Sequence, residues 1–132
     1  MKSFNVYPSN DGYWWIVKIY PTCKLMYRAY TRTPWADQIL DFAGIVLGLT
    51  YSGCTNRKKC LGIVLLNKED FNPRVIAHEA THMGIDYLRR VNKRALKNLQ
   101  MPFRAYDNES LAYAVGNCTQ QIMEKFNATR LK

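Results

Sequence analysis

The sequence predicts one α+β domain over residues 1–132, in which a short mixed or antiparallel sheet packs against two long helices. Three observations predict this fold class. The length of 132 residues suits a single domain with its own hydrophobic core. Residues 13–20 are aromatic and β-branched and residues 61–66 are largely apolar, which is typical of strands. Residues 72–91 and 108–127 repeat apolar side chains at helical spacing.

The first half of the chain is expected to supply most of the sheet. After the strand at 13–20 the sequence predicts a turn, and residues 24–31 form the partner strand of a hairpin. Thr33-Pro34 predicts a helix to about residue 43, because threonine followed by proline is a common helix start. Residues 45–50 either continue that helix or form a further strand.

Both long helices of the second half carry start signals. Asn72-Pro73 pairs a capping residue with proline at the first helical position, so a helix is expected from there to about residue 91. Asp107 or Asn108 caps a last helix that ends near residue 127. A short helix at 93–99, followed by a loop, is expected between them.

The first long helix contains both histidines of the chain in one string, His78-Glu79-Ala80-Thr81-His82. Helical residues four apart share one face, so two imidazoles there can converge on one tetrahedral ion. Glu79 lies about 100° round the helix from His78, where it can polarise a metal-bound water instead of binding the metal. The spacing therefore predicts a zinc site with Glu79 as a general base.

A catalytic zinc site is expected to have a third protein ligand, and the chain holds only 2 histidines. Glu109 is the favoured candidate, because it opens the last helix and has small residues, Ala112 and Gly116, on its own face. These small residues are expected to let the two helices approach closely enough to share an ion. Asp86 is the alternative, but a straight helix separates it from His78 by about 12 Å along the axis. Accepting the free N–H of a ligand histidine is the role that suits Asp86 better.

The two segments together resemble the gluzincin metallopeptidases, in which two helices supply His, His and Glu to zinc. His78-Glu79-Ala80-Thr81-His82 followed by Asn108-Glu109-Ser110-Leu111-Ala112-Tyr113 is similar in particular to small metallopeptidase-like proteins of tailed bacteriophages. The resemblance covers residues 72–127. It implies a minimal zincin-like domain, a hydrolase acting on peptide bonds, with His78, His82 and Glu109 as zinc ligands. It also implies that the strand at 61–66 pairs with an extended substrate.

The sequence departs from the large gluzincins in its supporting residues. The interval between His82 and Glu109 is longer than in thermolysin-like members. Tyr113 stands where those members have an aspartate that orients a zinc histidine. No residue can be carried over for the transition-state histidine of those members, and Tyr87, Tyr106 and Tyr113 remain open as candidates to supply its hydrogen bond.

The predicted reaction is hydrolysis of a peptide bond by a zinc-activated water. Zinc lowers the pKa of bound water towards ~7, and Glu79 accepts its proton and passes it to the departing amine. The rival interpretation is a binding module on the same scaffold, in which zinc is structural or catalysis is lost. Hydrolysis of bonds other than peptides also stays open, because the motif describes water activation and not the bond that is cut.

The charge of the chain favours an anionic partner. The net charge is +9, and the segment from residue 89 to 104 contains basic residues but no acidic one. This strip consists of Arg89, Arg90, Lys93, Arg94, Lys97 and Arg104, and Arg57-Lys58-Lys59 forms a second cluster. Nucleic acid or an acidic protein or peptide would suit it. A solvated basic helix end is the equally weighted alternative, since cations are favoured at helix C-termini.

Composition places the chain in the cytoplasm, or in the host cytoplasm for a phage protein. No apolar run reaches transmembrane length, and the first residues contain no apolar signal core. The cysteines Cys23, Cys54, Cys60 and Cys118 are therefore expected to be free thiols. Cys54 and Cys60 flank a predicted hairpin or loop and are the one pair that could come close in space.

Overall fold

The computed structural model describes residues 1–32, 48–52, 59–99 and 108–130. Its elements are, in chain order, β1 (Lys2–Val6), β2 (Trp14–Tyr20), α1 (Cys23–Thr31), β3 (Leu49–Ser52), β4 (Cys60–Asn67), α3 (Pro73–Val91), α4 (Lys93–Leu99) and α5 (Asn108–Arg130). The predicted α+β class is confirmed. Among the described residues, no helix has both the length and the apolar character that crossing a bilayer requires.

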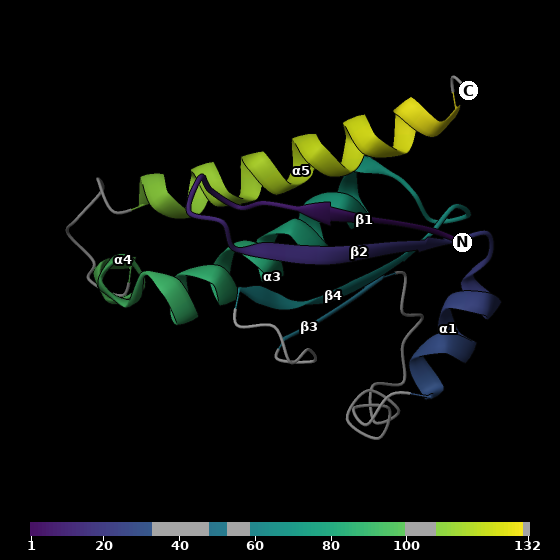
Figure 1. Cartoon of the computed structure of the whole chain (residues 1–132), viewed down its shortest axis with the longest axis horizontal. Helices are drawn as coiled ribbons and strands as arrows, with labels where there is room; N and C mark the ends of the chain where they lie inside the picture. Colours follow the sequence, from purple (N-terminus) through teal and green to yellow (C-terminus); the bar gives the residue numbers. More distant parts are fainter. Residues whose placement is uncertain (33–47, 53–58, 100–107, 131–132) are drawn as a thin grey trace.

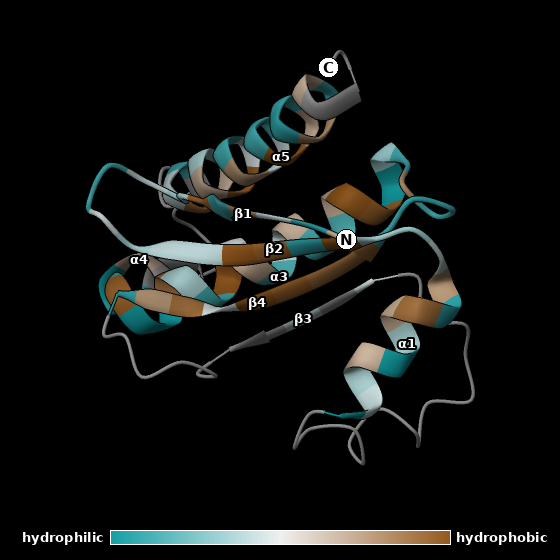
Figure 2. Ribbon diagram, turned by 45° about the vertical axis from the view of Figure 1, so that its right-hand side comes forward, coloured by the Kyte–Doolittle hydropathy of each residue, from teal (hydrophilic) through white to brown (hydrophobic). Residues whose placement is uncertain are grey.

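Four strands form one mixed sheet in the order β1-β2-β4-β3. β1 and β2 pair antiparallel, β2 and β4 pair parallel, and β3 and β4 pair antiparallel. β4 is brown along most of its length in the hydropathy colouring, and all but one of its residues are buried, as a strand covered on both faces requires (Figure 2). β4 therefore lies inside the sheet, and β3 is an edge strand.

Helices cover both faces of the sheet (Figure 1). The main core lies between the sheet and the pair α3 and α5, and it includes Val64 and Leu66 of β4. A smaller core lies on the opposite face, where α1 buries Met26 and Tyr30 against Leu65. Because neighbouring residues of β4 point to opposite faces, one strand serves both cores.

The N-terminal segment is joined to the last helix. The Tyr7 backbone N–H donates to Gln121 Oε1 at 2.8 Å, and Gln121 Nε2 donates back to the Tyr7 carbonyl at 2.7 Å. Asn117 Nδ2 donates to the Pro8 carbonyl at 2.9 Å. These bonds fasten the residues that follow β1 onto half-buried residues of α5, beside the main core.

The prediction of a strand at 24–31 is wrong, because this segment forms α1. Thr22 caps the helix by accepting from the Leu25 N–H at 3.1 Å. Met26 and Tyr30, four residues apart, are its buried residues, so a helical period was present beneath the tyrosine-rich composition that suggested a strand. The antiparallel partner of β2 is β1, an additional strand that the sequence did not predict.

The other predicted elements are confirmed where the structure describes them. β2, β4, α3, α4 and α5 lie where they were expected. Residues 49–50 belong to β3, which confirms the strand alternative for the end of the 45–50 segment. The predicted helix at 34–43 and the loop after residue 99 fall outside the described residues.

Candidate metal centre

The site is built on α3, whose start is fixed by local sequence. Asn72 caps the helix by accepting from the Val75 N–H at 3.0 Å, and Pro73 is its first residue. Val75, Ile76, Ala80 and Met83 are buried and belong to the main core. This apolar stripe fixes the rotation of the helix and turns the faces of residues 78 and 82 towards solvent.

His78 and His82 lie together on that exposed face. Their Nε2 atoms are 3.2 Å apart, and the ring centroids are 4.8 Å apart at an interplanar angle of 75°. Two imidazoles bound at about 2.05 Å to one tetrahedral zinc would have nitrogens roughly 3.3 Å apart. A hydrogen bond between a donor and an acceptor ring nitrogen accounts for the same spacing in the absence of metal. The pair is thus arranged as two zinc ligands would be.

Glu79 lies beside this pair but points into the protein, with only 3% of its surface exposed. Thr50 Oγ1 of β3 donates a hydrogen bond to its Oε2. Burial raises the pKa of Glu79, while the Thr50 bond and the two histidines act in the opposite direction. A desolvated carboxylate with a raised pKa is suited to accept and return a proton near neutral pH.

The expectation that the strand at 61–66 pairs with substrate is wrong. That strand is β4, and both of its edges are occupied, one by β2 and the other by β3. Among the described residues, no strand pairs with the outer edge of β3. β3 is also the strand whose Thr50 contacts Glu79, so the edge nearest the base belongs to β3.

Glu109 is exposed in the first turn of α5. α5 runs antiparallel to α3, since Phe126 stacks on Phe71 just before α3 while Leu111 and Val115 lie against Gly84. The first turn of α5 consequently lies beside the C-terminal part of α3, beyond His82. Within the described ranges, no group of three or more His, Cys, Asp or Glu side chains is placed to hold a metal ion. The segment 100–107, directly before Glu109's helix, lies outside those ranges.

The predicted reason for a close helix approach is also wrong. Ala112 and Gly116, the small neighbours of Glu109, are exposed, and a Cβ added at Gly116 would meet no atom within 4 Å. The close approach is made by Gly84 of α3 instead. A Cβ added there would lie 2.9 Å from Val115 Cγ2 and 3.2 Å from Leu111 Cδ1.

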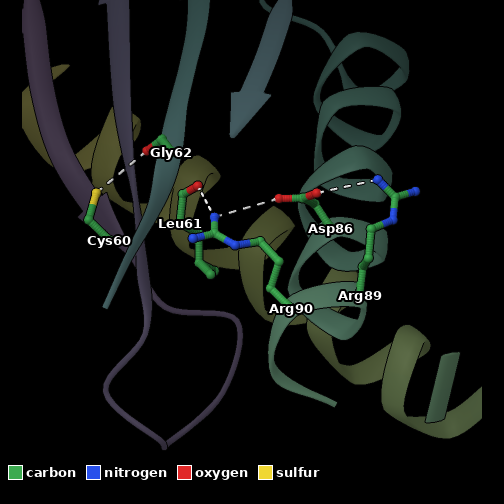
Figure 3. A network of polar contacts seen from close by, with 6 residues as sticks. All are labelled: Cys60, Leu61, Gly62, Asp86, Arg89 and Arg90. Atoms are coloured by element: carbon green, nitrogen blue, oxygen red, sulfur yellow. Dashed lines mark hydrogen bonds and ion pairs between the residues drawn. The ribbon is translucent and has the colours of Figure 1, made fainter. Parts of the chain in front are cut away.

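Asp86 is engaged by arginines, not by the histidine that it was expected to orient. Its carboxylate lies 3.6 Å from Arg89 Nη1 and 3.9 Å from Arg90 Nη1. Arg90 also donates to the carbonyl of Leu61, which is the extra residue of a bulge in β4 opposite β2. Figure 3 shows this network, which connects the end of α3 to the sheet.

The two candidate tyrosines that the structure describes are engaged elsewhere or exposed. Tyr87 is buried on the core side of α3, where its hydroxyl donates to Asp11 in the loop between β1 and β2. Burial and this hydrogen bond raise the pKa of Tyr87 to about 12. Tyr113 is 66% exposed, on the same face of α5 as Glu109. Tyr106 lies outside the described residues.

The described part of the basic strip is exposed to solvent. Arg89, Lys93, Arg94 and Lys97 are all exposed along the end of α3 and α4, while Arg104 and residues 57–58 fall outside the described ranges. Cys23, Cys60 and Cys118 take part in no disulfide within the described ranges, and Cys54 is not among the described residues. Comparison of the chain with family models, curated proteins and solved structures finds no match.

Thr50 and Gly48 are the site residues that the sequence did not indicate. Both residues lie close to Glu79 because β3 pairs at the edge of the sheet. This pairing brings Thr50 into contact with Glu79, 29 positions further along the chain. Neither Gly48 nor Thr50 belongs to a sequence motif, so no local pattern predicts the contact.

Proposed function

We propose that this protein is a zinc-dependent metallopeptidase, with His78, His82 and Glu109 as zinc ligands and Glu79 as the general base. One observation carries the proposal. Two imidazole nitrogens lie 3.2 Å apart on an exposed helix face, and the carboxylate between them in sequence is buried and hydrogen-bonded. A helix selected only for packing has no need of a buried carboxylate at this position.

The chemistry divides between the metal and the chain. When bound, zinc would act as a Lewis acid on the scissile carbonyl and lower the pKa of the attacking water. Glu79 would accept a proton from that water and return it to the departing amine. Because Thr50 bonds Oε2, the other oxygen of the Glu79 carboxylate is the one left for this exchange.

Glu109 remains the preferred third ligand over Asp86. Its carboxylate is exposed in the first turn of the helix that packs against α3, whereas the Asp86 carboxylate is paired with Arg89 and Arg90. Binding zinc through Asp86 would require both ion pairs to break. A carboxylate free to reorient is the less costly donor.

An extended peptide is the proposed substrate, and the outer edge of β3 is its docking place. Edge strands present unpaired backbone donors and acceptors that an added strand can satisfy. The Glu79 carboxylate contacts β3 directly, so a peptide on this edge would pass close to the base.

Metal analysis and a hydrolysis assay test the proposal. Protein purified without added zinc should contain about one zinc ion per chain. It should cleave members of a peptide library, lose that activity with a chelator and regain it with zinc. Protein that binds no zinc, or that binds it and cleaves no peptide, would contradict the proposal.

The exposed basic strip at the end of α3 and along α4 favours a second candidate function, binding of nucleic acid or an acidic protein. Phosphate contacts release counterions, so affinity for nucleic acid would fall steeply as salt rises. Replacing Lys93, Arg94 and Lys97 with glutamine should reduce both the affinity and its salt dependence. Unchanged affinity in that variant would remove this candidate.

A further inference from the structure

Glu79 is held in a cradle made by the edge strand. Gly48 and Thr50 are two residues apart in extended backbone at β3, so they share one face of the sheet. Thr50 Oγ1 donates to Glu79 Oε2. A Cβ added at Gly48 would lie 3.0 Å from Glu79 Cγ and 3.2 Å from Oε1. One residue therefore holds the carboxylate and the other leaves room for it.

The helix alone does not orient the Glu79 carboxylate. α3 fixes the direction of the Cα–Cβ bond, but a glutamate side chain has three further torsions, whose restriction costs about 1.5–2 kcal/mol. The position of the carboxylate is set where the side chain ends, and there it meets β3. Only 3% of the surface of Glu79 is exposed, so its side chain is held against β3 and does not extend into solvent.

We infer that Thr50 is a positioning residue for the general base, and that Gly48 provides the space in which Thr50 holds it. The inference rests on the proposed function and adds residues that the zinc-binding motif does not contain. It also makes one strand responsible for two tasks, because the outer edge of β3 is the proposed docking place of the peptide. Base and substrate would then be aligned by the same backbone.

The experiment compares Thr50→Val with Thr50→Ser in the zinc-loaded protein. Valine keeps the shape of threonine but removes the hydroxyl, whereas serine restores it. Because a misplacement of about 1 Å can cost roughly 100-fold in rate, Thr50→Val should lower kcat about 10- to 100-fold with little change in KM or zinc content. Thr50→Ser should recover kcat to within about threefold of the wild type.

Thr119→Val is the matched control. Thr119 is half-buried like Thr50, but its hydroxyl donates at 2.7 Å to the carbonyl of Val115 within α5. Its substitution should leave kcat at the wild-type level. A similar loss in Thr119→Val would show that removing a half-buried hydroxyl acts through general stability, and would overturn the positioning role.

Gly48→Ala provides a second variant that removes no hydrogen bond donor. The added methyl group would press on the carboxylate at distances that require it to move. Lowered kcat with KM and zinc content retained supports the inference. Wild-type kcat in Thr50→Val, or equal impairment in Thr50→Val and Thr50→Ser, overturns it.

The wild-type and Glu79→Gln proteins separate this inference from the proposed function. If the zinc-loaded wild type cleaves no peptide, the proposed function fails and the positioning role falls with it. If the wild type is active, Glu79→Gln is inactive and Thr50→Val keeps wild-type kcat, the inference alone fails.

Discussion

α3 makes two contacts of different character, one with β3 and one with α5. Towards β3 it presents Glu79, whose carboxylate is hydrogen-bonded by Thr50. Towards α5 it presents Gly84, against which Leu111 and Val115 pack closely. The first contact is polar and places a reactive group. The second is apolar, and Glu109 lies on the solvent side of α5, away from it.

The difference shows how a site of this kind depends on distance along the chain. Spacing within one helix is enough to bring His78 and His82 together with Glu79 beside them. The position of Glu109 depends instead on the register of two antiparallel helices and on the segment 100–107. The motif residues within one helix are therefore organised by local geometry, whereas the position of the proposed third ligand depends on packing.

The largest expected effect is on kcat and comes from replacing Glu79, the residue of α3 that contacts β3. Glu79→Gln should lower kcat by about 10²–10⁴-fold, because the amide cannot accept the proton of the attacking water. Zinc content should stay at the wild-type level, since Glu79 is not a ligand, and mass spectrometry of the native protein would measure it. Turnover close to wild type, or loss of zinc in this variant, would contradict the role of Glu79.

The next largest effect is on zinc affinity and comes from replacing Glu109 of α5. Glu109→Gln should weaken zinc binding by more than about 100-fold, because even partners of zinc ligands contribute about 10- to 100-fold. Competition with a chromophoric chelator would measure the affinity. Asp86→Asn is the matched control and should change affinity only a few-fold, since Asp86 pairs with arginines. The reverse order of the two variants would assign the ligand to Asp86.

Two glycine substitutions test the helix contact through stability. Gly84→Ala places a methyl group 2.9 Å from Val115 Cγ2. This crowding costs roughly 1–3 kcal/mol, which outweighs about 1 kcal/mol gained from helix propensity. Gly116→Ala has open space and should receive the gain alone. Urea unfolding of the metal-free proteins would measure both, and equal stability of the two variants would contradict the described packing.

The last prediction concerns stability at alkaline pH. Burial raises the pKa of Tyr87 from 10.0 to about 12 and that of Cys118 from 9.0 to about 12. Between these values the folded state binds more protons than the unfolded state, so the free energy of unfolding falls as pH rises from about 9 to 12. Tyr87→Phe should remove the part of the decrease that begins near pH 10. A pH profile identical to that of the wild type would show that Tyr87 is not buried as described.

Much of the fold could be predicted from the sequence, because several elements carry their own signals. Asn72 and Pro73 announce α3, and its apolar stripe sets which face turns to solvent. α1 was mistaken for a strand because tyrosine and threonine favour strands, while its two buried residues, Met26 and Tyr30, form a short stripe. The buried contact of α1 with Leu65 decides the outcome, and that contact is not local.

The candidate site divides in the same way. The histidine pair and the base follow from a five-residue spacing, but the contact of Thr50 with Glu79 does not. The sequence predicts the close approach of α3 and α5 at the small residues Ala112 and Gly116, whereas the structure makes it at Gly84. Both glycines lie in helices, and only the packing of Leu111 and Val115 tells them apart.

The bonds between the segment after β1 and α5 bear on when the domain can form during synthesis. Tyr7 and Gln121 exchange two hydrogen bonds across 114 positions of the chain. Contacts of such separation raise the contact order, slow folding and require the late helix to have left the ribosome. We therefore expect the nascent chain to remain without a closed core until α5 is made. The proposed peptidase activity would then arise only after the synthesis of that helix.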